Sequence, residues 1–381
     1  MFSKKVIKEL LEAVNIHPGG LMVLEENQPK LVILDYQSYQ KMTLGKLSPV
    51  AVLKPKKVLV TGGAGYIGSH TARYLLQNGF EVVTLDNLST GYKEFVSGKF
   101  IEGDLADPDL LERSFSEHQF DAVVHFAASI EVEESMKQPE KYYANNVVNG
   151  LNLLTAMVNH GVNNIVFSST CVVYDEKVLS PVAETATINP TSTYGETKLV
   201  YERALKWFAQ AYGINSISLR YFNAAGASTD ATLGYAGKNP THLIPNVLNV
   251  ALGKKDLLTV FGNDYCTHDG TAVRDYIHVL DLAEAHKLSL DFMFESNTPV
   301  CEVFNVGTGK GYSVLEVINA VCERTGHMVK FEIGPRREGD RESVVADACK
   351  IKKTLGFKPK YSDLDTIIDT AWAWHKKRFG Q

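Results

Sequence analysis

We expect an α/β fold: a doubly wound parallel sheet with a smaller C-terminal lobe, preceded by a short α+β N-terminal extension. Two observations predict it. From Lys56 onward, short apolar runs rich in β-branched residues alternate with helical patterns, as in sheets whose two faces are covered by helices. The first of these runs leads through a glycine-rich turn into the first helical pattern. This order is typical of parallel βαβ units.

The glycine-rich turn is the element around which the chain is organised. The run Val58–Val60 predicts a buried strand, and Gly62, Gly65 and Gly68 follow it before a helical pattern that stops at Asn78-Gly79. Strand, glycine turn and helix is the context of a dinucleotide-binding Rossmann fingerprint. The first glycine permits the tight turn, the second lets backbone approach a pyrophosphate, and the third lets the helix pack on its strand.

A carboxylate follows at the distance that this fingerprint requires. The next predicted strand, Glu81–Leu85, ends at Asp86-Asn87. An acidic residue about 20 residues after the glycines accepts hydrogen bonds from a ribose 2′-hydroxyl and repels a 2′-phosphate. The sequence therefore predicts NAD rather than NADP as the cofactor.

The later elements continue the alternation. We expect a strand ending at Asp104, a strand over 121–128, a long helix over 140–160 that carries Asn145, and a strand over 164–170. The last strand ends in Ser168-Ser169-Thr170. Ligands of open α/β sheets bind outside the carboxyl ends of the strands, so these hydroxyl groups are expected at the site.

Tyr194 and Lys198 open the next helical pattern, four residues apart, so they share one helical face. A free tyrosine has a pKa near ~10. A neighbouring ammonium and a positive nicotinamide would favour the phenolate and lower that pKa toward neutrality. The pair is therefore predicted to act as a general base on a sugar hydroxyl.

Composition limits the alternatives. The chain has 381 residues, a net charge of −5 and 22% charged residues, which indicates an ordinary globular protein without a basic surface for nucleic acid. We expect no membrane-spanning segment and no secretory leader. The five scattered cysteines lack metal-ligand spacing, so we expect reduced thiols, no metal and a cytoplasmic location.

Residues 1–50 precede the nucleotide-binding strand and form a separate predicted unit. A helix over 4–15, a hairpin of 21–24 with 31–34 and a short helix after Asp35 are expected, followed by a linker at 51–55. This order resembles the N-terminal segment of Phd/YefM-type antitoxins, in which such a unit dimerises. Dimerisation or partner docking and a passive extension both remain open.

Beyond residue 56 the motifs resemble one family closely. Gly62, Gly65, Gly68, Asp86, the Ser168–Thr170 strand end and the Tyr194/Lys198 pair are similar to extended short-chain dehydrogenase/reductases. The stretches TGGAGYIGSH, LRYFNAAGA, THLIP, FGNDYCTHDGTAVRDYIHVLDLAEAH, FNVGTG and RREGD narrow the resemblance to UDP-glucose (UDP-galactose) 4-epimerases.

The resemblance implies an NAD-dependent interconversion of UDP-glucose and UDP-galactose through a transient 4-keto sugar. Tyr194 would take the proton of the 4-hydroxyl, Thr170 would bond the same oxygen, and Lys198 would bond the nicotinamide ribose. The implied NAD contacts are Gly62, Gly65, Tyr66, Ile67, Gly68, Asp86, Asn87, Asp104, Leu105, Phe126, Ala127, Ala128, Asn145, Ser168, Tyr194, Lys198 and Tyr221. The implied contacts of the UDP-sugar are Thr170, Asn223, His242, Leu243, Phe261, Arg274, Arg337, Asp340 and Val344.

The resemblance also divides the chain. It implies an NAD-binding Rossmann domain over 56–225 with a returning segment at about 275–306, and a UDP-sugar-binding lobe over 226–274 and 307–381. A homodimer through the helices at 140–160 and 194–212 is implied as well. Three candidate residues have structural alternatives, since Arg274 could pair with Asp275, Arg337 could pair with Glu338 or Asp340, and Phe261 could be a core residue.

Several functional alternatives stay open. The small Val344 would leave room beside C2 of the sugar for UDP-N-acetylhexosamines, and the same machinery would serve a UDP-pentose. A non-catalytic NAD-binding regulatory protein is the alternative from another class. Dehydratase chemistry is disfavoured, because Cys171 and Val172 follow Thr170 where that chemistry needs an acid.

Overall fold

The computed structural model describes residues 21–25, 28–33, 55–237, 240–337 and 339–380 of the chain. Its contacts divide the chain into two compact units, Met1–Pro55 and Lys56–Gln381. In the first unit β1 (Leu21–Glu25) pairs antiparallel with β2 (Gln28–Ile33), which confirms the predicted hairpin. The predicted helices over 4–15 and after Asp35 lie outside the described residues, as do residues 51–54 of the predicted linker.

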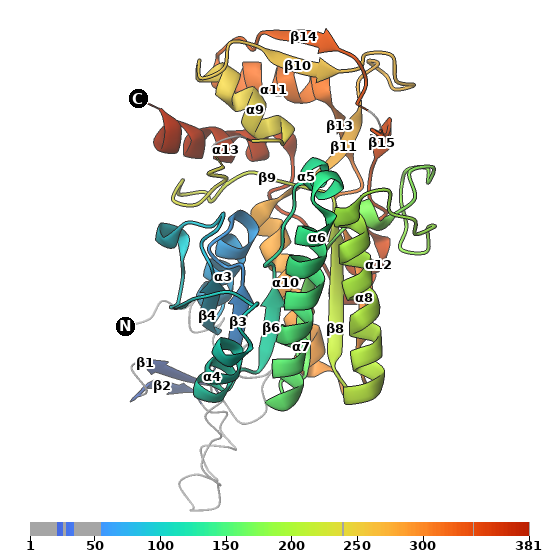
Figure 1. Ribbon diagram of the computed structural model, residues 1–381. Helices are drawn as coiled ribbons and strands as arrows, with labels where there is room; N and C mark the ends of the chain where they lie inside the picture. Colours follow the sequence, from blue (N-terminus) through green and yellow to red (C-terminus); the bar gives the residue numbers. More distant parts are fainter. Residues whose placement is uncertain (1–20, 26–27, 34–54, 238–239, 338, 381) are drawn as a thin grey trace, which may run out of the picture. The chain divides into compact units, whose positions relative to one another are not determined.

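The second unit is built on a seven-stranded parallel sheet (Figure 1), which confirms the predicted doubly wound architecture. The strand order is β12-β8-β7-β6-β3-β4-β5, so the sequence order reverses between β3 and β6. The strands are β3 (Lys57–Thr61), β4 (Glu81–Asp86), β5 (Lys99–Glu102), β6 (Ala122–His125), β7 (Asn164–Thr170), β8 (Asn215–Tyr221) and β12 (Cys301–Val306). Open α/β sheets bind ligands at such a switch point.

Two layers of helices cover the sheet, and the alternation of side chains along β3 shows why. Val58 and Val60 belong to one apolar core with α3 and α10, whereas Leu59 belongs to another with α4 and α7. Successive side chains of a strand point to opposite faces, so a strand covered on both sides is apolar throughout. The helices of this region are α3 (Tyr66–Gln77), α4 (Pro108–His118), α5 (Val132–Lys137), α6 (Pro139–Tyr142), α7 (Asn149–Asn159), α8 (Thr193–Tyr212), α10 (Val279–Glu295) and α12 (Cys349–Leu355).

The remaining segments form a smaller region with its own apolar core (Figure 1). Here α9, α11 and α13 pack on one another and on a two-stranded parallel sheet of β10 and β14. A further sheet joins β13, β11 and β15, and β9 also pairs with β11. The elements are β9 (Asn223–Ala225), α9 (Leu243–Ala251), β10 (Leu258–Phe261), β11 (Val273–His278), β13 (Gly311–Ser313), α11 (Val314–Thr325), β14 (Phe331–Gly334), β15 (Ser343–Val344) and α13 (Leu364–Phe379).

Three predicted boundaries are wrong. β5 ends at Glu102 rather than at Asp104, because Asp104 turns back to accept a hydrogen bond from the amide of Ala106. β6 ends at His125, and residues 126–128 form the loop that follows it. The predicted helix over 140–160 is α6 and α7 joined by a π-helical turn, Tyr143–Val148, a feature that is frequent at functional sites.

No helix within the described ranges is long and apolar enough to cross a membrane.

Candidate active site

The glycine turn leaves room for backbone where a side chain would not fit. Gly62 has φ +71°, and a Cβ there would lie 2.6 Å from the amide nitrogen of Ala127. A Cβ on Gly68 would lie 2.2 Å from the carbonyl oxygen of Gly62. Gly65 is the N-cap of α3 and provides no side-chain cap, so the first amides of this helix point outward at the end of β3. The turn therefore presents a helix N-terminus that can bind an anion.

Asp86 and its neighbours lie beside this turn. The Asp86 carboxylate accepts hydrogen bonds from the amides of Ala64 (2.9 Å) and Leu88 (2.8 Å), so it is fixed against the glycine loop. Asn87 donates to the Asp104 carboxylate at 2.6 Å, which links the ends of β4 and β5. Leu105, in contrast, packs its side chain into the core, so only its backbone can face a ligand.

The loop after β6 covers the other side of the turn. The amides of Phe126 and Ala127 both donate to the carbonyl oxygen of Thr61, at 2.9 and 3.2 Å. Ala128 follows in the same loop, and Asn145 of the π-helical turn donates to the Ser129 hydroxyl at 3.2 Å. The structure thus brings the glycine turn, this loop and the π-helical turn together.

Tyr194 and Lys198 lie on one face of α8, beside the end of β7. Ser192 caps the helix by accepting from the amide of Gly195, and Ser135 of α5 accepts from the amide of Tyr194. Lys198 Nζ donates to the carbonyl oxygen of Ser168 at 2.9 Å and lies 5.9 Å from the centre of the Tyr194 ring. The Ser168 hydroxyl is hydrogen-bonded to Tyr221, so these four predicted residues form one cluster.

Burial sets the protonation of this pair. It raises the pKa of Tyr194 well above its ordinary value, and a hydrogen bond with Thr170 only partly opposes that effect. Burial also lowers the pKa of Lys198 to about 7. The predicted lowering of the Tyr194 pKa depends on a positive nicotinamide as well as on Lys198, so it stays a prediction for the complex with NAD.

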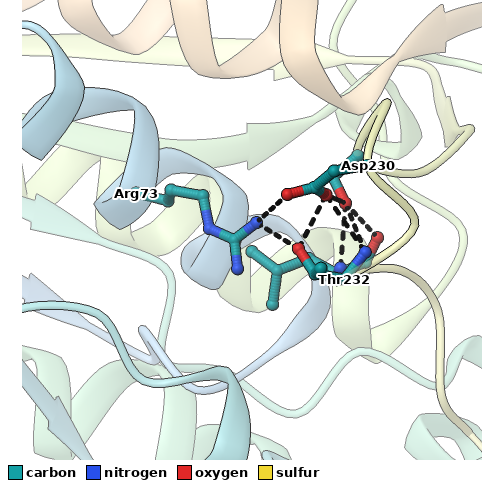
Figure 2. A network of polar contacts seen from close by, with 5 residues as sticks. Arg73, Asp230 and Thr232 are labelled. Atoms are coloured by element: carbon teal, nitrogen blue, oxygen red, sulfur yellow. Dashed lines mark hydrogen bonds and ion pairs between the residues drawn. The ribbon is translucent and has the colours of Figure 1, made fainter.

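The loop that follows β9 is hydrogen-bonded to α3, the helix that begins at the glycine turn. Tyr66, the first residue of α3, donates to the carbonyl oxygen of Gly226 at 2.7 Å. Two turns further along, Arg73 donates to Thr232 at 2.5 Å and contacts Asp230 at 3.5 Å (Figure 2). Ile67 packs against the core on the same helix. These contacts fix the segment after Gly226 over α3.

The predicted substrate residues fall into two groups. In the first, Arg274 of β11 forms an ion pair with Asp340 and lies in register with Val344 of β15. Val344 is buried with Val173, which follows Thr170 closely in sequence, so this group reaches the end of β7. The alternative pairing of Arg274 with Asp275 is wrong, since Asp275 accepts hydrogen bonds from the amides of residues 308, 309 and 346.

The second group consists of Phe261, at the end of β10, and Arg337. The Arg337 guanidinium is 4.0 Å from the centre of the Phe261 ring, a cation–π contact. His242 is the exposed N-cap of α9, which Leu243 begins, and its ring contacts Tyr235 edge-on. Asn223 of β9 is engaged elsewhere, since its amide donates to the backbone of Asp275 at 3.0 Å.

Comparison with known proteins decides the family. Residues 58–307 match the NAD dependent epimerase/dehydratase family. The UDP-glucose 4-epimerase of Halalkalibacterium halodurans is 47% identical over 84% of this chain and 96% of its own length. The chain belongs to the UDP-glucose 4-epimerase family.

Solved structures agree with this assignment. A crystal structure of UDP-glucose 4-epimerase from Brucella ovis in complex with NAD has a TM-score of 0.82 and 44% identity, over 85% of this chain and 98% of that one. The UDP-Glc/GlcNAc 4-epimerase of Campylobacter jejuni has a TM-score of 0.75 and 44% identity, over 84% and 99%. The predicted family and enzyme class are confirmed.

The same comparisons weigh the alternatives. A non-catalytic regulatory protein is not supported, because the relatives are epimerases. The UDP-pentose alternative is not favoured, since the relatives are UDP-glucose 4-epimerases. None of the matches supports the resemblance of residues 1–50 to antitoxin segments, which stays a prediction.

Sequence reasoning missed two buried charges beside the Tyr194/Lys198 pair. Glu202 of α8 and Arg220 of β8 form an ion pair at 2.5 Å, and both side chains are only 4% exposed. The spacing held a signal, because Glu202 lies four residues after Lys198 and eight after Tyr194, on the same helical face.

Proposed function

We propose that this chain interconverts UDP-glucose and UDP-galactose, with NAD as cofactor and Tyr194 as the general base. The observation that carries the proposal is the cluster of Tyr194, Lys198 and Thr170 at the carboxyl end of β7, two strands away from the glycine turn that follows β3 in the same sheet. Thr170 is positioned to bond the 4-oxygen of the sugar while Tyr194 accepts its proton. Lys198, anchored on Ser168, supplies the positive charge beside the phenol.

The chain offers NAD a site of the right shape and charge. The tight approach at Gly62 and Gly68 leaves backbone amides free for a pyrophosphate. Asp86, at the end of β4, provides a carboxylate for an adenosine ribose, and Asp104 with Asn87 lies beside it for the adenine. When bound, NAD supplies the acceptor and the donor for the hydride of C4.

The UDP portion is proposed to bind in the smaller region. The Arg274 guanidinium donates one hydrogen bond to the carbonyl oxygen of Val273 and one to the Asp340 carboxylate. Its remaining N–H donors are proposed to bind the diphosphate. Arg337 is held by its contact with Phe261 and presents a second guanidinium. Firm binding of UDP would let a 4-keto sugar turn about the diphosphate and present its other face to the same residues.

We further propose that UDP-N-acetylhexosamines are accepted. Val344 is small for a position beside the sugar, and it packs against the segment that follows Thr170. The relative from Campylobacter jejuni is a UDP-Glc/GlcNAc 4-epimerase, so the family includes enzymes for both sugar classes.

A homodimer and a cytoplasmic location complete the proposal. Exposed apolar side chains gather on the π-helical turn and on α8, which are in contact: Tyr143, Val148, Trp207 and Tyr212 are 41 to 69% exposed. Adjoining apolar patches of this kind mark interfaces. Trp207→Glu is expected to convert a dimer to a monomer in sedimentation velocity. All five cysteines are free thiols, as in reducing compartments.

The test is an assay of protein purified without added NAD. UDP-galactose and UDP-N-acetylgalactosamine are incubated separately, and the 4-epimers are quantified, with Tyr194→Phe as the matched control. Turnover of UDP-galactose that requires Tyr194 is the expected result. NAD retained without turnover of either sugar would overturn the proposal.

A further inference from the structure

Glu202 is the third polar side chain on the face of α8 that carries Tyr194 and Lys198. Its carboxylate accepts hydrogen bonds from the Ser169 hydroxyl (2.5 Å) and from Nε of Arg220 (2.9 Å). A buried ion pair is weak support for stability, because desolvation offsets the attraction. Its place beside the catalytic helix face suggests another purpose.

The contacts of Glu202 and Lys198 fall on consecutive residues of β7. Lys198 holds the carbonyl oxygen of Ser168, and Glu202 holds the hydroxyl of Ser169. Thr170 follows directly and ends the strand. These two hydrogen bonds, to consecutive residues of β7, fix the position of the strand end relative to α8 and its orientation about the strand axis. They therefore also fix the direction in which the Thr170 hydroxyl points toward Tyr194.

Glu202 is also the counter-charge of the buried Lys198. Burial lowers the pKa of Lys198 to about 7, and the charge of Glu202 opposes that shift. The other titratable groups that face the cluster are His125, whose pKa burial lowers to about 3, and Tyr142, Cys171 and Tyr221, whose pKa values burial raises. None of them supplies negative charge near neutral pH, so Glu202 is the anion that favours the ammonium form.

Arg220 connects Glu202, through further hydrogen bonds, to the segment beside Val344 in the proposed UDP-sugar half. Its NH1 donates to the Tyr174 hydroxyl at 3.0 Å, and Tyr174 donates to Asn305 at 2.7 Å. Asn305 in turn donates to the carbonyl oxygen of Val182, whose amide bonds Val345. A continuous chain of hydrogen bonds thus joins α8 to Val345, which directly follows β15 and Val344.

We propose that Glu202 is a positioning residue of the epimerase reaction: with Arg220 it anchors the end of β7 on α8 and provides the counter-charge of Lys198. The inference rests on the proposed roles of Tyr194, Lys198 and Thr170. It assigns Glu202 no contact with substrate.

The main test is Glu202→Gln, compared with Glu202→Asp and Ser169→Ala, over a range of pH. In Glu202→Gln we expect kcat for UDP-galactose to fall about 10- to 100-fold with little change in KM, since positioning rather than binding is lost. The alkaline limb of the kcat profile should move to lower pH, because Lys198 loses its proton more readily without the anion.

The companion variants separate charge from geometry. Glu202→Asp keeps the charge but shortens the side chain, so kcat should fall while the alkaline limb stays near its original pH. Ser169→Ala removes the hydrogen bond between β7 and Glu202 but leaves the ion pair of Glu202 with Arg220. It therefore tests the anchoring role even if Glu202→Gln does not fold. Its kcat should fall about 3- to 10-fold with an unmoved limb, and an unchanged kcat would overturn the anchoring role. Glu112→Gln, at a partly exposed pair with His160, is the matched control and should change nothing.

A readout independent of turnover distinguishes the two proposals. The titration of Lys198 is followed by NMR of protein labelled at the lysine ε-carbons, with Lys198→Met to assign the signal. The titration should shift to lower pH in Glu202→Gln. An absence of turnover in the unmodified enzyme would overturn the proposed function, whereas an unmoved Lys198 titration or a uniform loss of kcat at every pH would overturn this inference.

Discussion

The two halves of the site are assembled in different ways. The proposed NAD half depends on the glycine turn and Asp86, which lie within 25 residues of sequence along β3, α3 and β4. The proposed UDP-sugar half joins residues from β10, β11, β15 and the segment before β15, which span Phe261 to Val344. One half is a local backbone shape, and the other is a long-range arrangement of side chains.

This difference predicts different sensitivities. Backbone shape is lost when a single Cβ is added at a crowded glycine, whereas charged side chains can be changed singly and in pairs. The proposed catalytic cluster on α8 and β7 lies between the two halves, since Val173 packs against Val344 and α8 contacts the π-helical turn. Its loss should leave both halves intact.

The largest expected effect therefore comes from Tyr194→Phe. Removal of the proton acceptor should lower kcat about 10²- to 10⁴-fold, while bound NAD and the KM for UDP-galactose change little. Rates of epimerisation and the NAD content of the purified protein check this. A variant that loses NAD would show that Tyr194 supports the cofactor half rather than the chemistry.

A second variant is expected to disturb NAD binding without changing the residues of the catalytic cluster or of the UDP-sugar half. In Gly68→Ala the new Cβ would lie 2.2 Å from the Gly62 carbonyl, so the turn must move. We expect a loss of about 1–3 kcal/mol in the free energy of unfolding and weaker retention of NAD. Gly65→Ala is the matched control, because its Cβ would lie 3.3 Å from the same carbonyl oxygen. Its loss of stability and of bound NAD should therefore be smaller than that of Gly68→Ala. Equal effects of the two variants in calorimetry and NAD content would contradict the steric argument.

A third test addresses the substrate half. Arg274→Met should raise the KM for UDP-galactose roughly 10- to 100-fold, because a charge-assisted contact with phosphate is lost. Since Arg274 also pairs with Asp340, the double variant with Asp340→Asn should be less impaired than the two single effects predict. Additive losses in the measured KM values would indicate that the pair does not act as a unit.

The same difference explains what sequence could predict. The parallel sheet, the glycine turn, Asp86 and the Tyr194/Lys198 face follow from local spacing, and the strand over 164–170 is placed without error. The π-helical turn was missed because the spacing of side chains over six residues does not distinguish an i+5 from an i+4 hydrogen-bond pattern. The Glu202–Arg220 and Arg274–Asp340 pairs depend on which strands become neighbours, which the sequence does not state locally.

The smallest expected effect concerns which sugar the proposed UDP-sugar half accepts. Val344→Tyr places a large side chain beside the proposed sugar position, in register with Arg274. We expect the ratio of kcat/KM for UDP-N-acetylgalactosamine to that for UDP-galactose to fall roughly 3- to 30-fold, equivalent to about 0.7–2 kcal/mol of discrimination, within the range for a steric change in a pocket. Measurement of both sugars on one preparation cancels any loss of folded protein. An unchanged ratio would show that Val344 faces only the core that it shares with Val173 and Phe222, and that sugar size is selected elsewhere.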